Sequence, residues 1–187
     1  MSYFETIKCN NFEVFNLDYH KKRVIDTIGI DINIKEYIYP PNPNFLKCNL
    51  FYDFDGIIEI TYTPYVKKKI KSFKLVYDNS IIYDKKATNR DAIDKLVEKK
   101  QNCDEIIIVK NNLITDTSIA NIAIFYDNKW FTPKTPLLKG TTRERYINLG
   151  YIKQKDITVD MLLNAKKIAL MNAMIGFDIK SNFDIIT

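Results

Sequence analysis

Two adjacent lysines, Lys85 and Lys86, stand just before a predicted helix, with Arg90 four residues after the second. A deprotonated lysine amine attacks an aldehyde, and an apolar pocket or a nearby cation lowers the lysine pKa toward that state. On an extended segment adjacent side chains point to opposite faces, so only one of the two can enter such a pocket. A pair of solvated lysines in front of a helix is the alternative.

Two other places in the sequence suit a phosphate. Arg23 lies on a predicted amphipathic helix, and a guanidinium binds phosphate through two donors and keeps its charge when buried. Gly140 stands before Thr141 and Thr142 where another helix is predicted to begin. There the free N–H groups, the hydroxyl donors and the close approach that glycine allows would all favour an anion. The alternatives are a surface arginine and ordinary helix capping by the threonines.

The remaining candidates are an acid, a histidine and a turn. Asp116 lies at the end of a predicted strand and is either a functional carboxylate or an ordinary turn acid. His20 is the only histidine and invites a general-base role. Asn172 and Ala173 open a predicted β-turn after an apolar run that is typical of a buried strand.

The elements that must position these residues are short strands and a few helices, which indicates an α+β fold. Hydrophobic periodicity and turn signals predict strands at 3–8, 12–17, 45–54, 57–63, 70–77, 104–109, 112–116, 121–126, 129–132 and 168–171. Helices are predicted after a cap at Asp18, near 89–100, at about 141–148 and at 158–166. The strand at 70–77 is expected in the antiparallel sheet of the first half. A turn at 78–80 predicts a boundary between a domain of residues 1–79 and one of residues 80–187.

Composition narrows the class of protein. With 187 residues, 46% of them hydrophobic, the chain can bury a core. No apolar run approaches the roughly 20 residues that span a bilayer, and no signal-peptide pattern opens the chain. The three cysteines have no CxxC spacing, so we expect free thiols, a cytoplasmic location, no metal and no membrane partner. The net charge of +5 suits anionic ligands, and without a zinc, KH or RRM signature we expect no nucleic-acid partner.

Four segments, in order along the chain, resemble the class IV family of pyridoxal-phosphate (PLP) enzymes. That family includes branched-chain and D-amino-acid aminotransferases and 4-amino-4-deoxychorismate lyase. The segments are Phe4-Glu5-Thr6-Ile7 with His20-Lys21-Lys22-Arg23; Lys86-Ala87-Thr88-Asn89-Arg90; Thr115-Asp116-Thr117-Ser118-Ile119-Ala120-Asn121; and Thr132-Pro133 with Leu137-Leu138-Lys139-Gly140-Thr141-Thr142-Arg143. Asn172-Ala173-Met174-Ile175-Gly176 is a weaker fifth similarity.

The resemblance implies a role for each candidate. Lys86 would hold PLP as a Schiff base and, once released by substrate, move a proton at the substrate carbon. Asp116 would keep the pyridine nitrogen protonated, so that the ring is an electron sink. The phosphate would be bound by Arg23, Gly140, Thr141 and Thr142, and the substrate would lie beside Asn172 and Ala173. The resemblance makes His20 structural.

The resemblance also implies a fold and an assembly. The expected fold has a small N-terminal α+β domain and a C-terminal domain with a mixed, barrel-like sheet. The family's active sites lie between two domains and are shaped by a homodimer partner. This chain departs from the family in its short N-terminal part, which predicts a trimmed pocket, and in Asp116, where many relatives have Glu.

Three activities fit these residues. A lyase would take a small amino substrate, 4-amino-4-deoxychorismate, and release pyruvate and 4-aminobenzoate, a folate precursor. An amino-acid transaminase and a PLP-binding protein without turnover are the alternatives. Thr6 favours the lyase, because branched-chain aminotransferases usually have Gly there and a threonine can relay a proton or contact the substrate.

Overall fold

The computed structural model describes residues 1–187, which form two compact units. Unit 1 comprises residues 1–67 and 85–89, and unit 2 comprises residues 68–84 and 90–187. The division falls after residue 67 rather than at the expected boundary after residue 79. The cause is the strand that follows, β5 (Ser72–Tyr77), which pairs parallel with β6 (Glu105–Lys110) of unit 2. The prediction that this strand joins the first antiparallel sheet is therefore wrong.

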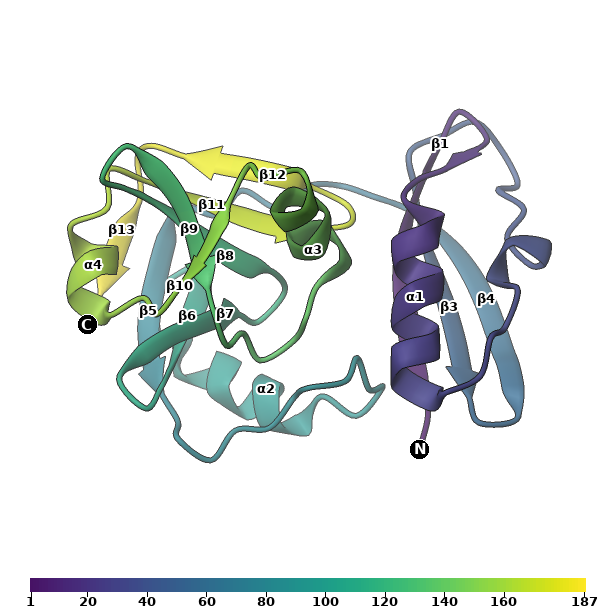
Figure 1. Ribbon diagram of the computed structural model, residues 1–187, viewed down its shortest axis with the longest axis horizontal. Coiled ribbons are helices and arrows are strands. Elements are labelled where there is room, and N and C mark those ends of the chain that lie inside the picture. The colour runs from purple at the N-terminus through teal and green to yellow at the C-terminus, as the bar shows by residue number, and fades with distance from the viewer. The chain divides into compact units, whose positions relative to one another are not determined.

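Unit 1 is a four-stranded antiparallel sheet with a helix against one face (Figure 1). The strands β1 (Tyr3–Asn10), β2 (Glu13–Val14), β3 (Leu46–Asp53) and β4 (Gly56–Pro64) are ordered β2-β1-β3-β4. Alternate residues of β1 and β3 are buried, so one face of each strand is in the core, as period-2 alternation predicts.

The helix α1 (Leu17–Ile28) supplies the other side of the core of unit 1. Its buried Val24 and Ile28 belong to one cluster with Ile7 and Leu50 of the sheet. The helix ends at Gly29, whose φ of 74° is the left-handed conformation that glycine adopts without a steric penalty. Its N-cap is Asn16, with φ 56°, so the predicted cap at Asp18 is wrong and Asp18 lies in the first turn. A short 3-10 helix, η1 (Ile34–Glu36), follows before β3.

Unit 2 is built on a mixed nine-stranded sheet. Its helical segments are α2 (Asp91–Val97), η2 (Glu98–Lys100), α3 (Thr141–Asn148) and α4 (Val159–Leu163). The strands after β6 are β7 (Leu113–Thr117), β8 (Asn121–Tyr126), β9 (Lys129–Pro133), β10 (Lys153–Lys155), β11 (Lys167–Asn172), β12 (Gly176–Lys180) and β13 (Asp184–Ile186).

The main path of that sheet runs β10-β9-β8-β7-β6-β5-β13, and β11 joins both β8 and β12. Residues 106–109 of β6 are all buried, which is typical of a central strand covered on both faces. The mixed sheet with few helices confirms the α+β class.

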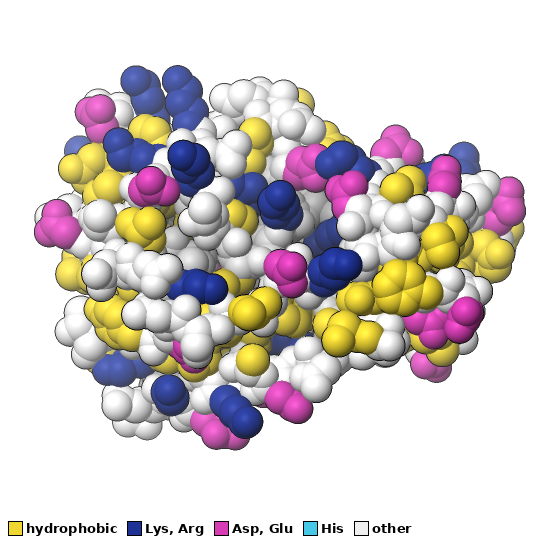
Figure 2. All heavy atoms as spheres, turned by 60° about the horizontal axis from the view of Figure 1, so that its bottom comes forward, with side chains coloured by type: hydrophobic (Ala, Val, Ile, Leu, Met, Phe, Trp, Pro, Cys, Tyr) yellow, Lys and Arg dark blue, Asp and Glu magenta, His cyan; other side chains and the backbone are white.

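Three further features concern the helices, the surface charges and the cysteines. No helix is both long and apolar enough to cross a membrane. Basic and acidic side chains are interspersed on the face drawn in Figure 2. The three cysteines, Cys9, Cys48 and Cys103, are buried and free.

Candidate active site

Lys85 and Lys86 lie on opposite sides of β1 in unit 1. The segment 85–89 runs beside that strand, where the Phe4 N–H donates to the Lys86 carbonyl at 3.0 Å. The Lys86 Nζ lies 4.2 Å from the centre of the Phe4 ring. The Lys85 Nζ instead donates at 2.8 Å to the Thr27 carbonyl, in the last turn of α1, where the helix dipole favours a cation. Lys85 thus stabilises the C-terminal end of α1, and only Lys86 lies on the face of β1 that points away from α1.

Thr6 shares the face of Phe4, because residues two apart on a strand point the same way. Its hydroxyl donates at 3.3 Å to Oδ1 of Asn49, the residue directly opposite on β3. We call this side of the sheet, away from α1, the open face. The open face therefore brings an amine, a hydroxyl and an amide together within unit 1.

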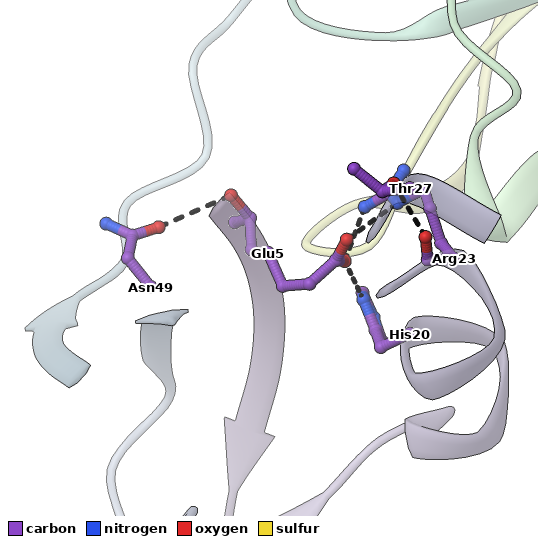
Figure 3. A network of polar contacts seen from close by, with 6 residues as sticks. Glu5, His20, Arg23, Thr27 and Asn49 are labelled. Carbon is purple, nitrogen blue, oxygen red and sulfur yellow. Dashed lines mark hydrogen bonds and ion pairs between the residues drawn. The ribbon is translucent and has the colours of Figure 1, made fainter. Parts of the chain in front are cut away.

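The opposite face of β1 carries a buried ion pair. Figure 3 shows Glu5 pointing toward α1, with Asn49 on the other side of the strand. Nε and Nη2 of Arg23 donate to the two Glu5 oxygens at 2.8 and 2.5 Å, and His20 Nδ1 is 2.5 Å from the same carboxylate. Burial would raise the pKa of Glu5, but the Arg23 charge and the His20 hydrogen bond lower it to about 2.

This arrangement bears on two predicted roles. His20 is only 1% exposed and is held on Glu5, which fits a structural residue. Arg23 commits two donors of its guanidinium to a carboxylate, so its role toward a phosphate stays a prediction.

In unit 2, Asp116 is the centre of a buried polar network. It lies directly opposite Asn121 across the hairpin formed by β7 and β8. Asp116 Oδ1 accepts from Asn121 Nδ2 at 2.7 Å, and Oδ2 accepts from the Leu138 N–H at 2.9 Å. The same Asn121 Nδ2 donates to the Leu138 carbonyl at 2.7 Å. The acid is thereby tied to the turn that precedes α3.

Burial is the main influence on this acid, and it raises the pKa of Asp116 to about 6. The hydrogen bonds from Leu138 and Asn121 and the charge of Arg143 act in the opposite direction. Arg143 is itself buried and donates to the Pro133 carbonyl at 2.8 Å. An ionised carboxylate can accept about four hydrogen bonds, so Asp116 keeps the capacity to accept another.

The N-terminus of α3 has the properties of an anion site. Gly140 is its N-cap and has no side chain with which to cap it. Thr141 and Thr142 are the first two residues of the helix, after the N-cap position, and both are buried. A Cβ built on Gly140 would lie 2.0 Å from Asn121 Oδ1, so the space beside this glycine is filled by the Asn121 amide.

The turn at residues 117–120 links Asp116 to the predicted substrate residues. Arg90 Nη2 donates to the Ser118 carbonyl at 2.9 Å, and Asn172 Nδ2 donates to the Ile119 carbonyl at 3.2 Å. Asn172 Oδ1 also accepts from the Met174 and Ile175 N–H groups at 3.0 Å each, which fixes the turn that contains Ala173. Arg90 and Asn172 thus hold the Asp116 hairpin from outside.

PLP carries an aldehyde, a ring nitrogen and a phosphate. Unit 1 contains an amine that suits the aldehyde, at Lys86. Unit 2 contains a buried carboxylate that suits the ring nitrogen, at Asp116, and the N-terminus of α3, which suits a phosphate. Asn49 and the roles of Glu5 and Asn121 were missed from the sequence. One signal in the sequence could have revealed Asn121. The four residues between Asp116 and Asn121 predict a hairpin in which these two side chains lie opposite each other.

Comparison with known proteins gives a consistent result. Residues 57–181 match the sequence model of a family described as amino-transferase class IV. An uncharacterised protein of Haemophilus influenzae is 32% identical over 184 residues, which cover 92% of this chain and 97% of that protein.

Solved structures are also similar to the chain. A crystal structure from Haemophilus somnus 129PT, provisionally named a 4-amino-4-deoxychorismate lyase, is 28% identical with a TM-score of 0.81, over 94% of this chain and 97% of that one. The PLP-bound form of a hypothetical aminotransferase from Mycobacterium tuberculosis shares the fold at 14% identity, with a TM-score of 0.78 over 97% of this chain and 81% of that one.

Proposed function

Because the chain belongs to the class IV aminotransferase family, we propose that it is a PLP-dependent 4-amino-4-deoxychorismate lyase. Members of this family are enzymes that use PLP, and this chain is an enzyme of that family. The lyase reaction, which produces the folate precursor 4-aminobenzoate, is the more specific part of the proposal. The name given to the Haemophilus somnus structure, which aligns over nearly the whole of both chains, supports it.

The observation that carries the proposal is the open face of unit 1. The Lys86 amine lies over Phe4, and the Thr6 hydroxyl is the next side chain along the same face of β1. When bound, PLP supplies the electron sink for a carbanion at the substrate carbon. In the proposed reaction the Lys86 amine takes the proton from the ring carbon that bears the amino group. The bond between the adjacent ring carbon and the enolpyruvyl oxygen then breaks, so that the ring becomes aromatic, and the methylene carbon of the released enolpyruvate gains a proton to give pyruvate.

Thr6 is proposed to hold or relay that returning proton. Its hydroxyl donates to Asn49, which leaves its own oxygen lone pairs as acceptors. In unit 2, Asp116 is proposed to face the ring nitrogen, and the first-turn N–H groups of α3 with Thr141 and Thr142 to bind the phosphate. Asn172 and Ala173 are proposed to contact the substrate. We also propose a homodimer, which sedimentation would report as twice the 22.0 kDa chain.

The test loads the purified protein with PLP and follows pyruvate and 4-aminobenzoate after 4-amino-4-deoxychorismate is added. Lys86→Ala should abolish both the visible absorbance of the lysine-bound cofactor and the two products. Lys85→Ala is the matched control, because its amine lies on the opposite face, and it should keep both. Cofactor absorbance without pyruvate would overturn the lyase. Transfer of an amino group from an amino acid to a keto acid would then identify a transaminase, and the absence of any turnover would identify a PLP-binding protein.

A further inference from the structure

The hairpin formed by β7 and β8 contains a buried asparagine, Asn121, beside the acid. Asn121 is 5% exposed and lies directly opposite Asp116 in the sheet register. Its side chain contacts three separate pieces of unit 2: the Asp116 carboxylate, the Leu138 carbonyl and the space beside Gly140. These pieces belong to the acid, to the turn before α3, and to the N-cap of α3.

The hydrogen bonds fix the orientation of the Asn121 amide. Two acceptors, Asp116 Oδ1 and the Leu138 carbonyl oxygen, each lie 2.7 Å from one end of the amide. Only the NH2 group can donate to both, so Oδ1 must point the other way, toward Gly140. An ideal Cβ at Gly140 would lie 2.0 Å from that oxygen, which is far inside contact distance. Glycine at position 140 is therefore required by Asn121.

We infer that Asn121 is a positioning residue, which sets the ionisation of Asp116 and holds the N-terminus of α3 against it. The Leu138 N–H donates to Asp116 Oδ2 at 2.9 Å while the Leu138 carbonyl accepts from Asn121, so acid, amide and turn form a closed ring of hydrogen bonds. Removing the amide takes one donor from the carboxylate and one from the turn. The assignment of the acid to the cofactor ring rests on the proposed function, but the coupling itself concerns unit 2 alone.

Two consequences distinguish this role from simple filling of space. A carboxylate that loses a charge-assisted donor in a buried site becomes harder to ionise, so the pKa of Asp116 should rise above its value near 6 in Asn121→Ala. A Cβ at position 140 should be costly only while Asn121 is present. Gly140→Ala should therefore lower the melting temperature by roughly 5 °C or more in the wild-type background and by about 1 °C or less in the Asn121→Ala background.

The experiment uses the full chain without PLP. Selective carboxyl-13C labelling of aspartate, with Asp116→Asn to assign the signal, gives the Asp116 titration in the wild type and in Asn121→Ala. Asn164→Ala is the matched control, because this asparagine donates to exposed Asp160 and should leave the Asp116 titration unchanged. Melting temperatures of the two single variants and of the double variant complete the cycle. Asn121→Ser, which keeps a small polar side chain, replaces Asn121→Ala throughout if the alanine variant does not fold.

We expect a higher Asp116 pKa in Asn121→Ala. We also expect Gly140→Ala to lower the melting temperature markedly only in the chain that keeps Asn121. An unchanged Asp116 titration in Asn121→Ala would overturn the inference, and so would an equal effect of Gly140→Ala in both backgrounds. Neither measurement depends on turnover. A protein that releases no pyruvate would therefore refute the proposed function and leave this inference standing, and the reverse also holds.

Discussion

At the scale of single residues, the candidate site depends on which face of a strand a side chain occupies. Lys85 and Lys86 are chemically identical neighbours, yet the first donates to the end of α1 and the second lies over Phe4. Glu5 and Thr6 show the same division, one in a buried ion pair and the other on the open face. The alternation of a pleated strand thus separates the residues that support the fold from the candidate chemical residues.

Replacing Thr6 by valine tests the hydroxyl without changing the shape or the strand propensity of the side chain. We expect Thr6→Val to reduce lyase turnover roughly 10- to 100-fold, because a positioned proton relay is removed. PLP affinity, measured by titration of the cofactor absorbance, should change less than twofold. Thr6→Ser keeps the hydroxyl and should retain most activity. Parallel losses of cofactor binding and turnover would show that Thr6 only supports the fold.

Asp116→Asn tests the charge of the buried acid with a side chain of the same size. Without the carboxylate the ring nitrogen of bound PLP would lose its proposed partner, so we expect turnover to fall about 100-fold or more. Cofactor capture by Lys86 should survive and be visible in the absorbance spectrum. If the variant binds PLP and turns over at the wild-type rate, Asp116 does not act on the ring.

At the scale of elements, β1 is joined to α1 through the buried Glu5 carboxylate, which pairs with both Arg23 and His20. Glu5 is 0% exposed, and the loss of one partner of a buried pair typically costs about 3–5 kcal/mol. Glu5→Gln should therefore lower the melting temperature by roughly 10 °C. Asp31→Asn is the control, because its pair with Lys21 is exposed and such pairs contribute about 1 kcal/mol or less. Similar effects of the two substitutions in a thermal melt would contradict a special role for Glu5.

Elements with a strong local signal could be predicted from the sequence. The helix α3 and the hairpin of β3 and β4 are found where periodicity and turn residues put them. The prediction of the partner of β5 was wrong, because the hydrophobic pattern of a six-residue strand is compatible with either sheet. The order strand, helix, strand of β5, α2 and β6 was the better guide to the pairing of β5, because two parallel strands need such a crossover connection between them. The strands β10, β12 and β13 were missed, because they are three to five residues long and depend on their neighbours.

The candidate chemical residues of the site were proposed only through family resemblance, and the partners that hold them in place could not be predicted from the sequence. A single lysine or aspartate carries no local signature of its surroundings. The Glu5 carboxylate and the Asn121 amide gain their roles from contacts with segments 15 and 17 residues away, at His20 and Leu138. Such contacts follow from tertiary packing, which periodicity does not encode.

At the scale of the whole molecule, the two units contain buried acids whose pKa values move in opposite directions. In unit 1 the pKa of Glu5 is lowered to about 2. Its ionised form stabilises the fold above the ordinary value of 4.5, and that contribution, about 3 kcal/mol, is lost as the pH falls toward 2. In unit 2 the pKa of Asp116 is raised to about 6, so folding favours its protonated form and unit 2 gains stability as the pH falls from 6 toward 4.

Acid should consequently open unit 1 before unit 2. Hydrogen exchange measured by mass spectrometry, corrected for intrinsic exchange rates, should show protection falling in β1 and β3 between pH 4 and 2 while β6 and β8 stay protected. Glu5→Gln supplies the control, since without the carboxylate the protection of unit 1 should be low already and nearly constant across this interval. Loss of protection in both units at one pH would mean that the chain unfolds as a single cooperative body, in which the ionisation of Glu5 does not decide where unfolding begins.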